Sequence, residues 1–298
     1  MLEIRRLRLL HELQRRKTIA AVAEALHFSP SGVSQQLAQL ESEVGVPLLE
    51  RVGRGVRLTD AAQVLVSHAD AVIRRLERAE AEVAALRDTA VGTVRIATFQ
   101  TAALALVPPM LDRLSDHPGL RVELTQIEPE KALPALLARD FDLMLSEEYP
   151  GVSTLLSDEV DRLDLTSDEL ELAVPSVGRF ANSQPRLEDA AGCAWVMEPS
   201  GTMARRWATD LCRSAGFEPD VQFESDDMLT HRELVRRGHA AAFLPSLLAR
   251  ALPSSLETCP IGQARMIFTL VRQGRAAHPT ILATREALRE ATVNQKFY

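Results

Sequence analysis

Apolar positions recur at helical spacing through the first part of the chain. Residues 4–13 place Ile or Leu at every third position, which predicts a first helix. Thr18 is a preferred N-cap residue and precedes a second apolar stripe over about 19–26. Ser29 can cap a third helix with Pro30 at its first position, where the missing N–H costs nothing. The apolar stripe of this third helix consists of Val33, Leu37, Leu40 and Val44.

The opposite side of the third helix is uncharged, whereas a solvent-facing side normally carries Lys and Glu. Its hydroxyl, amide and small side chains can approach base edges closely while offering hydrogen-bond donors and acceptors. Two short helices with a tight connection form a helix-turn-helix, so this side is predicted to read DNA bases. The side consists of Ser31, Gln35, Ala38, Gln39 and Ser42, with Ser34 on its flank.

Two short strands joined by a glycine-containing turn are expected next, at 48–51 and 56–58. This hairpin would form a wing that carries Arg51, Arg54 and Arg57. Arginines in such a place suit contacts with phosphates or insertion into a narrow minor groove. The alternative is that they are solvated turn residues.

The charge distribution agrees with a DNA-binding head on an acidic body. Residues 1–58 carry nine Arg or Lys and six Glu, a balance of +3 within a net charge of −7. The three cysteines are far apart, and the seven histidines lack ligand spacing, so no metal site, disulfide framework or cofactor is expected. No apolar stretch resembles a signal peptide or is long enough to span a bilayer, so we expect a cytoplasmic protein.

A family resemblance is carried by residues 18–59, TIAAVAEALHFSPSGVSQQLAQLESEVGVPLLERVGRGVRLT. This segment resembles the winged helix-turn-helix of LysR-type transcriptional regulators. Leu49 and Ala62 stand where the family usually has Phe and Gly, and Ser-Pro-Ser replaces the frequent Ser-Gln-Pro. The last change alters the family's first base-contacting position, so the target sequence cannot be transferred. The resemblance implies base contacts by Ser31, Ser34 and Gln35, and the predicted DNA-binding residues are Ser29, Pro30, Ser31, Ser34, Gln35, Gln39, Arg51, Arg54 and Arg57.

Thr59 can cap a long helix that extends to about residue 86. Apolar residues alternate along it at spacings of four and three, a seven-residue repeat that suits pairing with another helix. Packing against the same chain is the alternative. In the family this helix pairs with its mate and sets the separation of two DNA-binding heads, which implies a homodimer or homotetramer. The predicted contact residues are Leu65, Val72, Leu76, Ala79, Val83 and Leu86.

Strands and helices alternate from residue 91 onward, which predicts a parallel α/β sheet. Two such units resemble the two-lobed effector domain of the same family, which is similar to a periplasmic solute-binding fold. The expected domains are 1–58 (winged helix-turn-helix), 59–88 (linker helix) and 91–298 (effector domain). Lobe I would comprise about 91–163 and 266–298, and lobe II about 164–265. Strands are expected at 92–98, 120–128, 141–148, 169–176, 193–198, 221–225, 240–245 and 264–272, and helices at 101–119, 129–140, 201–215, 227–237 and 279–291.

Ligands of open α/β sheets bind beyond the carboxyl ends of the strands. Helix N-termini there favour an anion, although plain helix capping explains each serine or threonine equally well. Three acidic residues near the same rim favour an amino group on the ligand, as in an amino acid. The candidate effector-binding residues are Thr98, Gln100, Thr101, Glu128, Ser146, Glu198, Ser200, Gly201, Thr202 and Asp226.

The sequence therefore predicts a DNA-binding transcriptional regulator whose effector is an amino acid or another small carboxylate. Its expected partners are double-stranded DNA, the small-molecule effector and further copies of the chain, with RNA polymerase as an additional candidate. Three alternatives are an effector-independent architectural DNA-binding protein, a solute-binding protein and an enzyme. An enzyme would pair Ser200 with His231 or His239, but no GxSxG, HExxH or GxGxxG motif is present.

Overall fold

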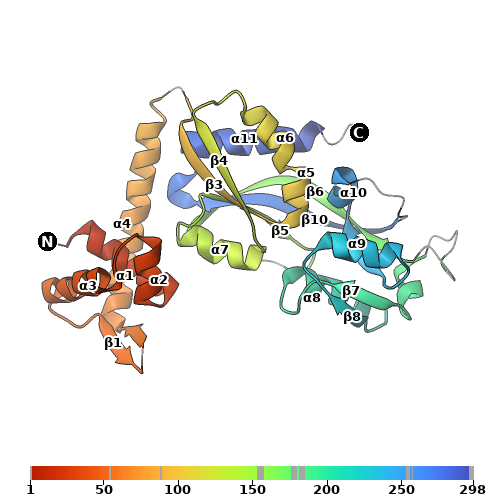
Figure 1. Cartoon of the computed structure of the whole chain (residues 1–298), viewed down its shortest axis with the longest axis horizontal. Coiled ribbons are helices and arrows are strands. Elements are labelled where there is room, and N and C mark those ends of the chain that lie inside the picture. The colour runs from red at the N-terminus through yellow and green to blue at the C-terminus, as the bar shows by residue number, and fades with distance from the viewer. Residues whose placement is uncertain are drawn as a thin grey trace.

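The computed structural model describes residues 2–53, 55–87, 89–152, 158–175, 180, 185–252, 256 and 258–294. A small head at the N-terminus connects through one long helix to a larger α/β body (Figure 1). Among the described residues, no helix is both long and apolar enough to cross a membrane.

The head is built as the sequence predicts, because its helices begin at capping side chains. The hydroxyl of Thr18 accepts a hydrogen bond from Ala21 N at 3.2 Å, and that of Ser29 accepts one from Gly32 N at 3.0 Å. A carboxylate oxygen of Glu41 accepts hydrogen bonds from two backbone N–H groups at the start of the wing. The head comprises α1 (Ile4–Arg16), α2 (Ile19–Ala25), α3 (Pro30–Val44), β1 (Leu49–Val52) and β2 (Gly55–Leu58).

The linker helix α4 (Asp60–Ala84) has two apolar sides. One side is buried first against the head, at Val66 and Ala69, and then against the body, at Ile73 and Ala81. The other side is the predicted pairing stripe, which is exposed. The exposed fractions are 40% for Val72 and Leu76, 64% for Val83 and 84% for Leu86. Ala79 is also exposed, while Leu65 is half-buried against the head.

The body contains a mixed sheet, so the expectation of an all-parallel sheet is wrong. Strands β3, β4 and β5 are parallel, but β10 runs antiparallel to both of its neighbours. This happens because β10 returns from lobe II and enters lobe I against the direction of β5. The sheet has the order β4-β3-β5-β10-β6-β9, formed by β3 (Gly92–Thr98), β4 (Leu120–Gln126), β5 (Leu143–Glu148), β6 (Val160–Ala173), β9 (Ala242–Pro245) and β10 (Thr258–Arg272).

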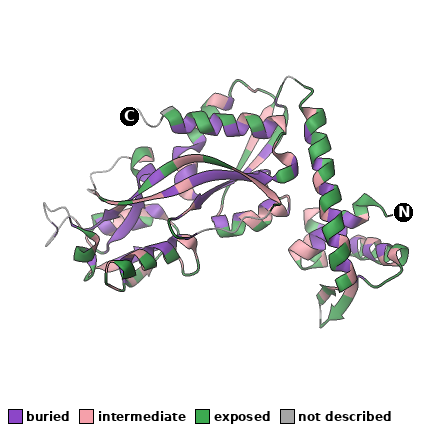
Figure 2. Ribbon diagram, turned by 180° about the vertical axis from the view of Figure 1, so that it is seen from behind, coloured by how far each residue is buried: buried purple, intermediate pink, exposed green. Residues whose placement is uncertain are grey.

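Strands β6 and β10 are longer than the sequence pattern predicts. Residues 160–168 and 258–263 extend them, and the two strands pair along most of their length. These extensions contain many polar residues, so hydrophobic patterning does not mark them as strand. The pair crosses both lobes and forms the backbone of the body (Figures 1 and 2). Lobe II adds the parallel pair β7 (Ala194–Met197) and β8 (Asp220–Glu224), linked to the larger sheet by a bridge between Trp195 and Ala241.

Helices cover both faces of the sheet in lobe I. The single helix expected over 101–119 is two helices, because Pro108 cannot continue a helix past its first turn. The short α10 was not expected. The helices of the body are α5 (Gln100–Ala105), α6 (Val107–Leu114), α7 (Pro129–Leu137), α8 (Met203–Ser214), α9 (Met228–Arg236), α10 (Ser246–Ala251) and α11 (Pro279–Asn294), with 3₁₀ turns η2 (Leu187–Ala190) and η3 (Gln273–Arg275).

The domain boundaries assigned from the sequence stay predictions. The first of them lies beside the observed end of β2 at Leu58 and the start of α4 at Asp60. The expected division of the lobes near 163 and 265 falls inside β6 and β10, because these two strands are continuous through both lobes.

Candidate functional site

The uncharged side of α3 faces away from the head. Ser31, Ser34, Gln35, Ala38, Gln39 and Ser42 are all exposed. The serines are partly used locally, since Ser34 Oγ donates to Pro30 O at 3.0 Å and Ser29 Oγ caps the helix. Within the described chain the amides of Gln35 and Gln39 have no hydrogen-bond partner, so they are free to contact a second molecule.

The wing offers less free positive charge than its sequence implies. Arg57 is exposed but pairs with Glu50 across the hairpin at 2.8 Å. Arg51 is exposed and has no ion pair among the described residues. Arg54 lies outside the described residues. Arg51 is therefore the wing cation that the structure leaves available for a phosphate.

A small cavity of about 30 Å³ lies between the two lobes. Four of the ten candidate effector residues do not line it: Thr98 and Ser146 are buried in the sheet, while Ser200 and Gly201 line a neighbouring groove beside α8. The cavity brings together the other six candidates, namely Gln100, Thr101, Glu128, Glu198, Thr202 and Asp226.

Arg265 on β10 forms the floor of this cavity, and the sequence analysis missed it. Its side chain is 4% exposed and donates to Asp168 at 2.9 Å, to Thr101 Oγ1 at 2.7 Å, and to Glu147. Its Nη1 also lies 3.3 Å from the Tyr149 hydroxyl. Thr101 therefore positions Arg265 rather than presenting a free hydroxyl. An arginine inside an apolar strand was the signal for this site, because a buried guanidinium requires carboxylate partners.

Side chains from lobe I reach across the cavity to helices of lobe II. Gln100 Nε2 donates to Asp227 Oδ1 at 2.6 Å, and Gln100 Oε1 accepts from Met228 N at 2.7 Å. Glu130 Oε1 accepts from Met203 N at 2.9 Å, at the N-terminus of α8. The remaining space suffices for about one water molecule. The lobes are thus closed on each other, and a larger ligand requires them to separate.

Thr202 serves as the N-cap of α8. Its Oγ1 accepts from Arg205 N at 3.1 Å and donates to Pro199 O at 2.9 Å. The capping alternative weighed in the sequence analysis therefore describes Thr202 in this closed arrangement.

The cavity carries an excess of negative charge. Glu128, Glu130, Glu147, Glu198 and Asp226 line it, against the single cation Arg265. Burial, and then the charges of Asp226, Glu147 and Glu130, raise the pKa of Glu128 to about 7. Burial likewise raises the pKa of Glu147 and of Glu198, although Arg265 opposes both shifts. Such a site favours a ligand that brings positive charge.

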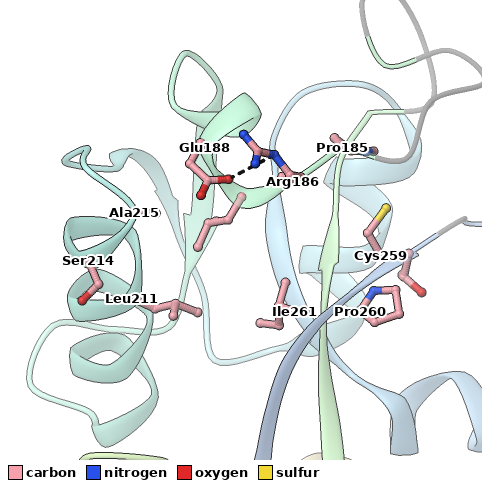
Figure 3. A pocket seen from close by; sticks show the side chains of 11 residues that line it. Pro185, Arg186, Glu188, Leu211, Ser214, Ala215, Cys259, Pro260 and Ile261 are labelled. Carbon is pink, nitrogen blue, oxygen red and sulfur yellow. Dashed lines mark ion pairs between the residues drawn. The ribbon is translucent and has the colours of Figure 1, made fainter.

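The largest groove described lies elsewhere, at the far end of lobe II. Figure 3 shows its lining, with Arg186 and Glu188 paired at its rim and Leu211 and Ile261 on its walls. Its volume is about 650 Å³, but it contains none of the candidate effector residues. The interlobe cavity remains the better candidate because charged groups from both lobes converge there.

We predict that Glu128→Gln reduces the pH dependence of stability. The folded-state pKa of Glu128 lies above the ordinary value of 4.5, so folding is favoured by protonation of this group. That stabilisation is complete below about pH 4.5 and disappears as the pH rises through about 7. Urea unfolding between pH 4.5 and 7.5 should show a shallower decline for Glu128→Gln than for the parent chain. Glu24→Gln, at an exposed head position, is the control; identical profiles for all three proteins would refute the assignment.

Comparisons with known proteins identify both parts of the chain. The model of the "Bacterial regulatory helix-turn-helix protein, lysR family" matches residues 4–63, and that of the "LysR substrate binding domain" matches residues 87–293. Transcriptional dual regulator GltC of Bacillus subtilis is 29% identical over 263 residues, covering 87% of this chain and 86% of GltC. The dual regulator OxyR of Escherichia coli is 28% identical over 248 residues, covering 83% and 80% of the two chains.

Solved structures show the same arrangement of head, linker helix and body. A full-length OxyR variant from Pseudomonas aeruginosa aligns with a TM-score of 0.70 and 18% identity, covering 98% of this chain and 94% of that one. Full-length CbnR in complex with its target DNA aligns with a TM-score of 0.55 and 23% identity, covering 97% and 99%. These matches confirm the fold class expected from the sequence. The chain belongs to the LysR family of DNA-binding transcriptional regulators.

Proposed function

We propose that the uncharged side of α3 reads base edges in a DNA major groove while the wing contacts the backbone. The observation that carries this proposal is the exposure of an uncharged helix side whose Gln35 and Gln39 amides lack partners in the described chain. An amide can donate to and accept from one adenine, which gives base discrimination. Arg51 adds attraction to phosphate that does not depend on sequence. A regulator bound to genomic DNA would act in the cytoplasm, with RNA polymerase as a further partner.

We expect Gln35→Ala and Arg51→Ala to weaken DNA binding in different ways. Gln35→Ala should reduce the preference for specific over random duplex by about tenfold while leaving the salt dependence unchanged. Arg51→Ala should weaken binding to all sequences similarly and reduce the salt slope by about one unit or less. Titrations of both variants on specific and random duplex at several salt concentrations measure this. Equal losses on both duplexes for Gln35→Ala would contradict its role as a base reader.

The exposed stripe of α4 supports an oligomer of this chain. Val72, Leu76, Val83 and Leu86 form an apolar line along a helix whose opposite side is already buried. Continuous exposed apolar surface of this kind marks interaction sites. The stripe carries the seven-residue repeat of a helix pair, so a second α4 is the partner we propose. Two heads on one paired helix would read two half-sites of DNA.

Leu76→Glu should convert the oligomer into monomers or smaller species, because it places a charge within the proposed helix pair. Ala71→Glu is the matched control, since Ala71 is exposed on the same helix but lies about 100° away from the stripe. Sedimentation velocity at micromolar concentration distinguishes the two. An unchanged sedimentation coefficient for Leu76→Glu would exclude the stripe as the interface.

For the effector, we propose a small molecule with a protonated amine, such as an amino acid, bound between the lobes. The excess of carboxylates at the cavity supports the amine. When the lobes separate, the Met203 N–H that now bonds to Glu130 becomes available to a ligand carboxylate at the N-terminus of α8. Coupling to transcription requires that the ligand bind the open and closed arrangements unequally.

Thermal unfolding with the standard amino acids, each paired with its N-acetyl derivative, tests the amine. At least one amino acid should raise the melting temperature by a few degrees, while its N-acetyl derivative should not. Glu128→Gln should lose this response. Glu188→Gln, at the distant groove of lobe II, should keep it. Equal shifts from a free amine and its acetylated form would rule out recognition of the amine.

Several relatives are named hydrogen peroxide-inducible genes activators, including one from Pectobacterium carotovorum. Thiol chemistry is not favoured at Cys212, because burial raises the pKa of its thiol to about 12. Very little thiolate would then be present at neutral pH, and the thiolate is the reactive form. We therefore base the proposal on the interlobe cavity.

A further inference from the structure

A second cavity, of about 250 Å³, lies where the head, the linker helix and lobe I meet. Helices α1 and α2 supply one wall, α4 another, and β3, β10, η3 and the segment after α7 the rest. Four carboxylates line it: Glu77, Glu80, Asp140 and Asp142. Six arginines line it: Arg8, Arg16, Arg95, Arg139, Arg272 and Arg275.

Most of these charges neutralise one another. Arg16 pairs with Asp140 at 2.6 Å and Arg95 with Asp142 at 3.1 Å. Arg272 and Arg139 share one oxygen of Glu77, at 3.0 and 3.1 Å.

Two arginines remain without a carboxylate. In the described chain neither Arg8 nor Arg275 has an ion pair, and Glu80 is the one lining carboxylate of which the same holds. The cavity therefore keeps a small positive surplus.

Buried hydrogen-bonding groups around this cavity have no partner among the described residues. Arg275 Nε and Arg139 Nη1 are donors without an acceptor, and the nearest carboxylate oxygen to Arg139 Nη1, on Glu12, is 3.6 Å away. Glu77 Oε2 is an acceptor without a donor. Buried polar groups without partners are costly and indicate an unseen bound species. A species that accepts from the arginines and donates to Glu77 would satisfy both kinds of group.

We propose that this junction cavity binds a phosphate group that retains a proton, as free hydrogenphosphate or as a small monoester. Its unprotonated oxygens would accept from Arg275 and Arg139, and its P–OH would donate to Glu77. Guanidinium groups suit this role because their planar donors match oxyanion geometry. Sulfate has the same shape but no proton at neutral pH, so it would leave Glu77 facing a negative oxygen.

The position of the cavity gives such a ligand a regulatory consequence. Arg8 belongs to the DNA-binding head, Glu77 to the linker helix, and Arg139 and Arg275 to lobe I. A bound phosphate group would contact all three parts and stabilise the arrangement in which they meet. By linkage, DNA that favours a different arrangement would weaken phosphate binding by the same factor.

Calorimetric titration of the full chain with inorganic phosphate, in a buffer free of oxyanions and without DNA, tests the proposal. We expect saturable binding with one site per chain, and affinity for sulfate about tenfold lower. Glycerol 3-phosphate, titrated in parallel, distinguishes free phosphate from a monoester as the preferred source. Because no DNA or amino acid is present, the result is independent of the function proposed above.

Arg275→Gln should weaken phosphate binding by about tenfold or more, and Arg8→Gln should weaken it less. Arg289→Gln is the matched control, since Arg289 is exposed on α11 and pairs with Glu286. Arg8 is exposed, so Arg8→Gln keeps the test valid if Arg275→Gln fails to fold. Absence of saturable binding, equal affinity for sulfate, or equal affinity in the Arg8 or Arg275 variant and the control would each overturn the proposal.

Discussion

The body of this protein depends on one buried positive charge, the guanidinium of Arg265. A charge at this depth is tolerated only when carboxylates and hydrogen bonds replace its lost hydration. Asp168 on β6 and Glu147 on β5 supply the carboxylates, and both strands neighbour β10 in the sheet. Asp168 also accepts from Leu247 N at the start of α10, so the same carboxylate holds that helix in place. Removing Arg265 would leave two carboxylates uncompensated at the point where the lobes meet.

The strand that carries Arg265 also connects the interlobe cavity with the linker helix. Arg272 lies seven residues further along β10, about 23 Å away in an extended strand. Its guanidinium is buried and pairs with Glu77 of α4 at 3.0 Å. Gly274 then brings η3 so close to α4 that an added Cβ would lie 2.7 Å from Arg74 O. A displacement of β10 at the cavity therefore has a direct mechanical route to the helix on which the DNA-binding heads are mounted.

Local interactions explain which parts of this structure could be predicted from the sequence. The caps at Ser29 and Thr59, the apolar stripes of the head and the exposed stripe of α4 depend on residues a few positions apart, and all are found where expected. The role of Arg265 depends instead on partners about 100 positions away in the chain, which no periodicity reveals. The lengths of β6 and β10 were missed for the same reason, since pairing between distant polar segments defines them.

The closed cleft also follows from a distant contact and changes how effector binding should be understood. Glu130 of lobe I already occupies the N-terminus of α8, a place that attracts a ligand carboxylate. An entering amino acid must therefore replace this contact and the Gln100 contacts before it gains its own. Its net affinity is the difference between the two sets, so a modest affinity can accompany a large movement of the lobes. A ligand that binds by such replacement necessarily distinguishes the open from the closed arrangement, and that difference is the free energy available to move the linker helices.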